Sequence, residues 1–240
     1  KNYMEIYQHD PYSAKGASAL YAAGLAYERA QNWRSVMRTF DDFVAKFPND
    51  RERRLEALFK SGYAREQNGN LRESYVIYNR ILSEFAANQK KGEFADDYIA
   101  AQTHFRIGEL MRRDFAAVKL LPPFELSMQR KQKLFSQMMK QLVDVARYNV
   151  AEWTTASFYT IGRSYEEFCQ DILNSPSPSG LDQDQIRQYW DMIQDKWIKP
   201  LQREALRYYA TNQKLAEQNG IDNHWVQQTR ERITSLRDRL

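Results

Sequence analysis

The three histidines and the single cysteine are the residue types with the widest chemistry in this 240-residue sequence, and they are scattered along it. No histidine (His9, His104 or His224) has a second His or Cys three or four positions on, the spacing that puts two metal ligands on one helix face. Cys169 has no second cysteine for a disulfide and no neighbouring histidine to activate it, so we expect it to be buried. The sequence therefore predicts no metal site.

Adjacent carboxylates occur at residues 41–42, 96–97 and 166–167. Neighbours on a helix point about 100° apart, so such a pair does not by itself work as an acid and a base on one substrate. The sequence also lacks a glycine-rich phosphate loop, a nucleophile elbow and a zinc-protease motif. We therefore expect a protein that is not an enzyme and that needs no cofactor.

A recurring pattern of small and aromatic residues organises the chain. The first copy has two stripes at helical spacing, one on each predicted helix, and ends at a proline. The first stripe is Leu20, Ala23, Gly24 and Tyr27, the second is Val36, Phe40 and Phe43, and the proline is Pro48. The equivalent residues of the next copy are Leu58, Gly62, Gly69, Leu71, Ser74, Tyr78, Ile81 and Phe85. Two more first helices lie at Ala101–Asp114 and Thr155–Gln170. One hairpin of helices cannot bury its own apolar face, so this periodicity predicts hairpins stacked in a solenoid.

This helix-turn-helix pattern with its closing proline resembles the tetratricopeptide repeat in a slightly lengthened form. The resemblance covers residues 1–88 most closely, although Arg65 stands where an aromatic residue is usual and Ala86 where proline is usual. It implies an all-α fold, a right-handed superhelical solenoid of antiparallel helix hairpins, with longer irregular helices in the C-terminal half. It also implies a scaffold for protein–protein interaction.

The FPND and SEFAAN endings of the first two copies and their long spacing resemble bacterial cell-envelope members of the family, of the BamD and YbgF types. This likeness implies a periplasmic or envelope-associated protein, with the cytoplasm as the alternative.

In tetratricopeptide folds, positions 2, 5, 9 and 12 of each first helix point into a concave groove. By register, the resemblance implies a partner-binding groove formed by Ser18, Tyr21, Leu25 and Glu28, by Glu56, Phe59, Tyr63 and Glu66, by Gln102, Phe105, Glu109 and Arg112, and by Ala156, Tyr159, Arg163 and Glu166. An aromatic residue recurs at position 5 of every copy. Rigid rings give contact area at low entropic cost, but packing between repeats explains them equally well.

We expect a single solenoid over residues 1–240. Its parts are the tail of a preceding repeat (1–12), two regular repeats (17–50 and 55–88), and divergent repeats (95–240) with an SPSPSG loop at 175–180. In the divergent part we expect helices over 91–121, 125–149 and 182–219, the last one bent near Pro200, and a final helix capped by Asn223. That final helix leaves an unmatched apolar face. We therefore interpret the chain as a piece of a longer protein, with further repeats and any targeting signal outside it.

Composition narrows the classes of partner. The net charge of +4 arises from 35 basic and 31 acidic residues that are interspersed, which argues against nucleic-acid binding. No apolar run is long enough to span a membrane. A basic run, Arg130, Lys131 and Lys133, could bind phosphate or lipid, but three charges are few for such a site, and a solvated helix face is the favoured interpretation.

The predicted function is a scaffold that binds a partner protein or peptide in the groove. One alternative is a structural spacer or self-assembly module in which Trp225 and the terminal helix make the contacts. Another is recognition of glycan or peptidoglycan strands by the aromatic residues.

Overall fold

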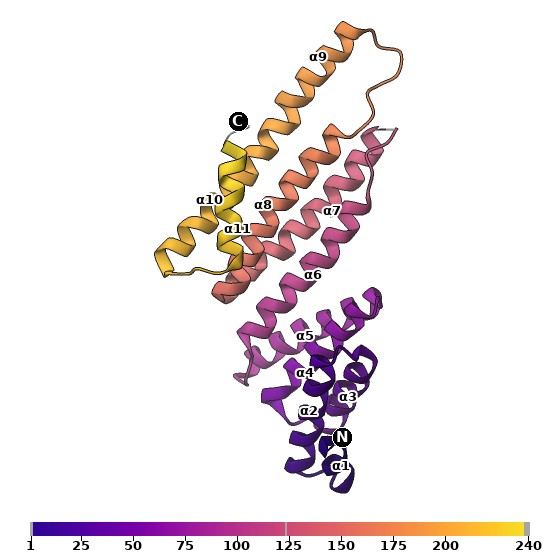
Figure 1. Cartoon of the computed structure of the whole chain (residues 1–240), viewed down its shortest axis with the longest axis vertical. Coiled ribbons are helices and arrows are strands. Elements are labelled where there is room, and N and C mark those ends of the chain that lie inside the picture. Colours follow the sequence, from indigo (N-terminus) through magenta and orange to yellow (C-terminus); the bar gives the residue numbers. More distant parts are fainter. Residues whose placement is uncertain (1, 123, 238–240) are drawn as a thin grey trace. The chain divides into compact units, whose positions relative to one another are not determined.

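The computed structural model describes residues 2–122 and 124–237, and every regular element in these ranges is helical (Figure 1). In order, the elements are α1 Asn2–His9, α2 Ala14–Arg29, α3 Trp33–Lys46, α4 Arg51–Gln67, α5 Leu71–Lys91, α6 Asp97–Ala117, α7 Phe124–Asp144, a 3₁₀ turn Val145–Tyr148, α8 Ala151–Leu173, α9 Gln183–Ile193, a π turn Gln194–Ile198, α10 Lys199–Asn219 and α11 His224–Arg237. The predicted all-α solenoid of helical hairpins is confirmed. None of the described helices is both long and apolar enough to cross a membrane.

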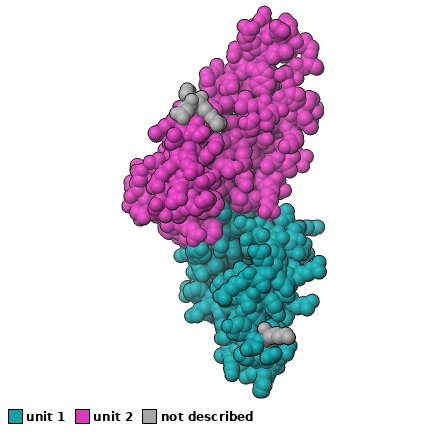
Figure 2. All heavy atoms as spheres, viewed as in Figure 1, with its two compact units in different colours: residues 1–107 teal, residues 108–240 magenta. Residues whose placement is uncertain are grey.

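The chain divides into two compact units, residues 1–107 and residues 108–240, with the boundary inside α6 (Figure 2). Within the first unit, each of α1 to α4 packs against the next helix in the sequence. Its core contains Leu20, Phe40, Phe43, Leu58 and Tyr78, all at most 3% exposed. Within the second unit, α8 is the central helix and packs against α7, α10 and α11.

The four hairpins share one close contact between their helices. A glycine of the first helix lies against a large side chain of the second, so a Cβ added at the glycine would come within 3.0 Å of that side chain. The pairs are Gly24 with Phe40, Gly62 with Tyr78, Gly108 with Leu142, and Gly162 with Tyr209. The later copies therefore have second helices too, α7 and α10, although the sequence pattern shows only their first helices clearly.

Replacing Gly162 with alanine is expected to destabilise the second unit. The new Cβ would lie 2.4 Å from the ring of Tyr209, which is fully buried and donates a 2.7 Å hydrogen bond to Glu166. Overpacking of this kind costs about 1–3 kcal/mol, which we expect to outweigh the gain of about 1 kcal/mol from alanine in a helix. Urea unfolding measures the difference. In a Tyr209→Ala background, which removes the ring, the same change should cost nothing further, and a stabilising effect in the wild type would contradict the close contact.

The helix predicted over residues 91–121 is shorter than expected. Gly92 adopts a left-handed conformation (φ 67°) and ends α5, since glycine takes this conformation without a steric penalty. The carboxylate of Asp96 then accepts hydrogen bonds from the backbone N–H of Tyr98 (2.9 Å) and Ile99 (3.2 Å) and begins α6. Two local end signals therefore override the apolar pattern that runs through this segment.

The helix predicted over residues 182–219 is continuous but changes its winding at Gln194–Ile198, directly before Pro200. Proline has no N–H, and its ring crowds the carbonyl one turn earlier, which favours a wider turn at this point. The Asp182 side chain caps the N-terminus of α9 in a capping box with Gln185.

The prediction that the last helix leaves an unmatched apolar face is wrong for the described residues. Asn223 caps α11 as expected and accepts from the N–H of Val226 (3.1 Å). The apolar face of α11 is buried on α8 and α10, where Ile233 and Leu236 join one cluster with Tyr159, Ala205 and Tyr209. Trp225 packs against the same cluster.

Candidate functional site

The aromatic residues at position 5 of the four first helices are all buried. Tyr21, Phe59, Phe105 and Tyr159 are 9%, 7%, 3% and 7% exposed. The edge of Tyr21 meets Phe40 and Phe43 with ring centroids 5.4 and 5.2 Å apart, and both partners belong to α3. This burial assigns the four rings to packing between helices, which the sequence left open as one of two explanations.

In the first two copies, position 12 is a glutamate. Its carboxylate binds a basic side chain of the next first helix in the sequence. Glu28 accepts from Nζ of Lys60 at 2.8 Å, and Glu66 accepts from the guanidinium of Arg106. Both partners directly follow the position-5 residue of the next first helix. Pairing of this kind fixes the register of neighbouring hairpins, because each bond needs both helices in place.

The fourth copy repeats this arrangement in the second unit. Glu166 accepts from the guanidinium of Arg232 on α11 and from the hydroxyl of Tyr209, as Glu66 accepts from Arg106 and from Tyr78. Burial, reinforced by these carboxylates, raises the pKa of both tyrosine hydroxyls. α11 therefore packs on α8 as the next first helix of a repeat would, since its Arg232 binds Glu166 as Arg106 of α6 binds Glu66 of α4.

In the third copy, position 12 is basic and the ion pairs change. Arg112 binds Glu109 (3.0 Å) and Glu167 (2.9 Å), and Arg163 binds Glu167 at 3.0 Å. The structure thus brings three predicted groove residues of the second unit together through Glu167. The sequence named Glu167 only as a neighbour of Glu166.

On α2 and α4, five predicted groove positions keep solvent exposure, and we call them the first-helix surface: Ser18, Leu25, Glu28, Glu56 and Tyr63. Gln102 on α6 is also partly exposed. Glu28 and Glu56 share the ammonium group of Lys60, at 2.8 and 3.7 Å. Two carboxylates share one cation here, and a second cation, Arg53, donates to Ser18 of the same surface at 3.3 Å.

Tyr63 is the aromatic residue of the first-helix surface, and three neighbours fix its ring. Phe59 stacks on it at 6.3 Å, the edge of Trp33 meets it at 5.9 Å, and the guanidinium of Arg106 lies over it at 5.2 Å. The ring remains partly exposed. It can therefore offer contact area to a partner without losing conformational freedom on binding.

The basic run on α7 separates into two kinds of residue. Lys131 is fully buried and donates to the carbonyl oxygens of Phe115 and Val118, both at 2.8 Å, while Arg130 and Lys133 are exposed. The burial of Lys131 could have been predicted from helical spacing, because Lys131 lies on the same stripe as four buried residues: Met128, Phe135, Met138 and Leu142.

The cysteine and the three histidines do not come together in one site. Cys169 is buried, and burial raises the pKa of its thiol to about 12, so it stays protonated and unreactive near neutral pH. His9 and His224 are exposed, and His104 is partly buried on α6. Within residues 2–122 and 124–237, no three His, Cys, Asp or Glu side chains could hold one metal ion.

Two segments of the chain, residues 18–50 and residues 56–87, match a family model described as the tetratricopeptide repeat. Repeats of this family commonly mediate protein–protein interaction and are typically not enzymes. No curated protein matches the chain, so its likeness to cell-envelope members of the family stays a prediction. The hairpins α2–α3 and α4–α5 are accordingly two tetratricopeptide repeats.

Proposed function

We propose that this chain is a non-enzymatic scaffold that binds a partner protein or peptide on the first-helix surface, as part of a bacterial cell-envelope assembly. The observation that carries the proposal is the ring of Tyr63, which is held on three sides and still partly exposed. Fixed aromatic side chains of this kind dominate the energy of many protein interfaces.

The charges around Tyr63 suggest the chemistry of the partner. Glu28 and Glu56 flank Lys60 with side chains 27%, 41% and 17% exposed. Such partly buried carboxylates attract basic side chains and N–H donors, and they fix the orientation of a bound segment more than they add to its affinity. A segment with an apolar residue against Leu25 and Tyr63 and a Lys or Arg near Glu28 fits this surface.

Photo-crosslinking at single positions of the full-length protein, in cells, tests the proposal. A benzoylphenylalanine in place of Leu25 reports on the first-helix surface, and one in place of Val76, which is 62% exposed on α5, serves as the matched control. We expect discrete adducts with a protein from position 25 that position 76 does not give. Identical adducts from both positions, or adducts with this chain alone, would contradict the proposal.

The envelope location is tested separately by separating the cell fractions of the same experiment. We expect the position-25 adducts in the periplasmic or membrane fractions. Adducts confined to the cytosolic fraction would leave the scaffold standing and remove the envelope assembly.

A further inference from the structure

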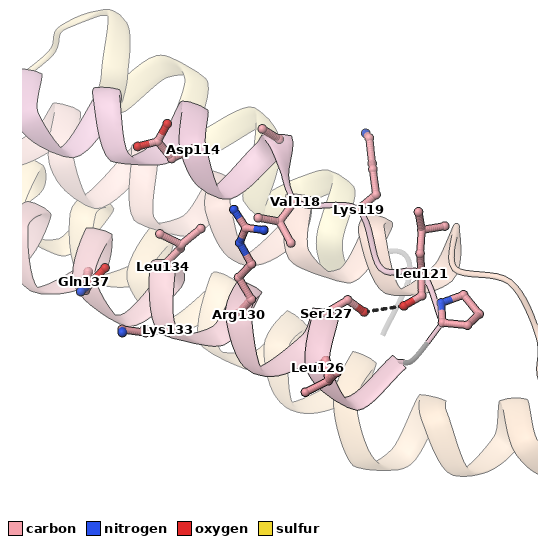
Figure 3. A pocket seen from close by; sticks show the side chains of 12 residues that line it. Asp114, Val118, Lys119, Leu121, Leu126, Ser127, Arg130, Lys133, Leu134 and Gln137 are labelled. Atoms are coloured by element: carbon pink, nitrogen blue, oxygen red, sulfur yellow. Dashed lines mark hydrogen bonds between the residues drawn. The ribbon is translucent and has the colours of Figure 1, made fainter. Parts of the chain in front are cut away.

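A hollow of about 920 Å³ lies in the second unit between the end of α6 and the first half of α7 (Figure 3). Its apolar lining includes Val118, Leu121, Leu126 and Leu134. Figure 3 shows Arg130 and Leu134 of α7 pointing toward α6. None of these residues belongs to the first-helix surface, so the hollow is a separate feature of the chain.

The segment after α6 forms one wall of the hollow, and side chains of α7 hold its backbone. Nζ of Lys131 binds the carbonyl oxygens of Phe115 and Val118 at 2.8 Å and forms an ion pair with Asp171 at 2.7 Å. Leu120 is buried, 4% exposed, and the hydroxyl of Ser127 donates to the carbonyl oxygen of Leu121 at 2.9 Å. The backbone from Phe115 to Leu121 is therefore held in place before any partner arrives, which lowers the entropic cost of binding there.

The hollow exposes apolar surface that a chain normally buries. Leu126 and Leu121 are 64% and 56% exposed, and both line it. Large apolar side chains that gather on one exposed patch, rimmed by polar residues, indicate a contact surface more often than single exposed leucines do.

The charge of the lining is predominantly positive. Lys119, Arg130 and Lys133 contribute three cations and Asp114 one carboxylate. In the part of the chain that the structure describes, none of these three basic side chains forms an ion pair or a hydrogen bond with another residue. Unpaired cations beside exposed leucines complement a partner that carries carboxylates beside apolar side chains.

The spacing along α7 favours a helical partner. Leu126, Arg130 and Lys133 follow one another at i, i+4 and i+7, and Leu134 lies at i+8, one turn beyond Arg130. A second helix with leucines and glutamates at the same intervals can place each side chain against its complement. Three cations are fewer than the clusters of about four to eight that bind anionic membranes.

We propose that the hollow between α6 and α7 binds an acidic amphipathic helix of a partner protein. The leucines of that helix pack against Leu121, Leu126 and Leu134, and its carboxylates pair with Arg130 and Lys133. This site shares no residue with the first-helix surface.

Selection from a displayed library of random peptides of about 16 residues, roughly four helical turns, tests the proposal on the whole chain. The groove variants are Leu126→Ser and Lys133→Glu. Their matched controls in the same unit are Leu173→Ser, where the leucine is 40% exposed on α8, and Lys214→Glu, where the lysine is exposed on α10. Circular dichroism checks that all four variants fold.

We expect the selected peptides to be rich in Asp, Glu and Leu. We also expect each groove variant to bind them at least about tenfold more weakly, with the controls within about twofold of the wild type. Binding should weaken further at about 0.5 M salt, because exposed charges are screened there.

Peptides that are not acidic, or that bind both groove variants as tightly as the wild type, would overturn the proposal. The proposal would also be overturned if no peptide is selected and phosphatidylglycerol vesicles bind the wild type but not Lys133→Glu. That result would assign the hollow to lipid. Dimerisation lost only in Leu126→Ser would assign it to a second copy of the chain.

Discussion

Replacing Glu66 with alanine is expected to lower the free energy of unfolding of the first unit by about 3 kcal/mol or more. The Glu66 side chain is fully buried and receives the hydroxyl of Tyr78 at 3.0 Å and the guanidinium of Arg106. Its loss leaves the Arg106 cation, 21% exposed, without its charged partner in the interior. Chemical denaturation followed by circular dichroism measures the loss.

The matched control is Glu204→Ala. Glu204 forms an ion pair with Arg207 on the surface of α10, with side chains 42% and 58% exposed, and such pairs contribute about 0–1 kcal/mol. Adding Arg106→Met to Glu66→Ala should restore part of the lost stability, because it removes the unpaired charge. If Glu66→Ala costs no more than Glu204→Ala, the buried ion pair does not hold α4 to α6.

Replacing Lys131 with methionine is expected to cost the second unit about 3 kcal/mol. The substitution keeps the length of the side chain but removes the ammonium that binds two carbonyl oxygens and Asp171, so these acceptors lose their donor in a buried place. An unsatisfied buried acceptor costs about 1–3 kcal/mol, and Lys131 serves more than one. Urea unfolding measures the change.

Lys133→Met is the control for this prediction, since Lys133 is exposed only two positions away and should change the stability by less than about 0.5 kcal/mol. Asp171→Asn in the Lys131→Met background should recover part of the loss, because it removes the unpaired carboxylate. Equal stability of the Lys131→Met and Lys133→Met chains would show that the buried ammonium does not stabilise the second unit.

The repeats could be predicted because their signals are local. Gly24 and Gly62 occur at the same place in each first helix, and each meets a ring of its own hairpin. Asn223, likewise, caps α11 through its own neighbour three residues on. Signals within one hairpin or one turn survive in a single sequence, which is why the fold class could be predicted.

The depth of the position-5 rings could not be predicted. The register says which side of a helix Tyr21 or Phe59 occupies, but their burial depends on Phe40, Phe43 and Tyr78 of the second helices. A side chain at the border between two packed helices can be either inside or outside, and the repeat pattern is the same in both cases.

The ion pairs between first helices are visible in the sequence only after the copies are aligned. Glu28 and Lys60 are 32 residues apart, and Glu66 and Arg106 are 40 apart. Glu166 and its arginine are 66 apart, because the long segment of α9, the π turn and α10 lies between them. Regular spacing alone would have missed this last pair.

The affinity of the purified chain for the protein crosslinked from position 25 tests the central claim most directly. It should be measured for the wild type, for Tyr63→Ala and for Tyr75→Ala, whose ring is 39% exposed on α5. The first-helix surface predicts that Tyr63→Ala weakens binding about tenfold or more and that Tyr75→Ala leaves it unchanged. An unchanged affinity in a folded Tyr63→Ala chain would contradict it.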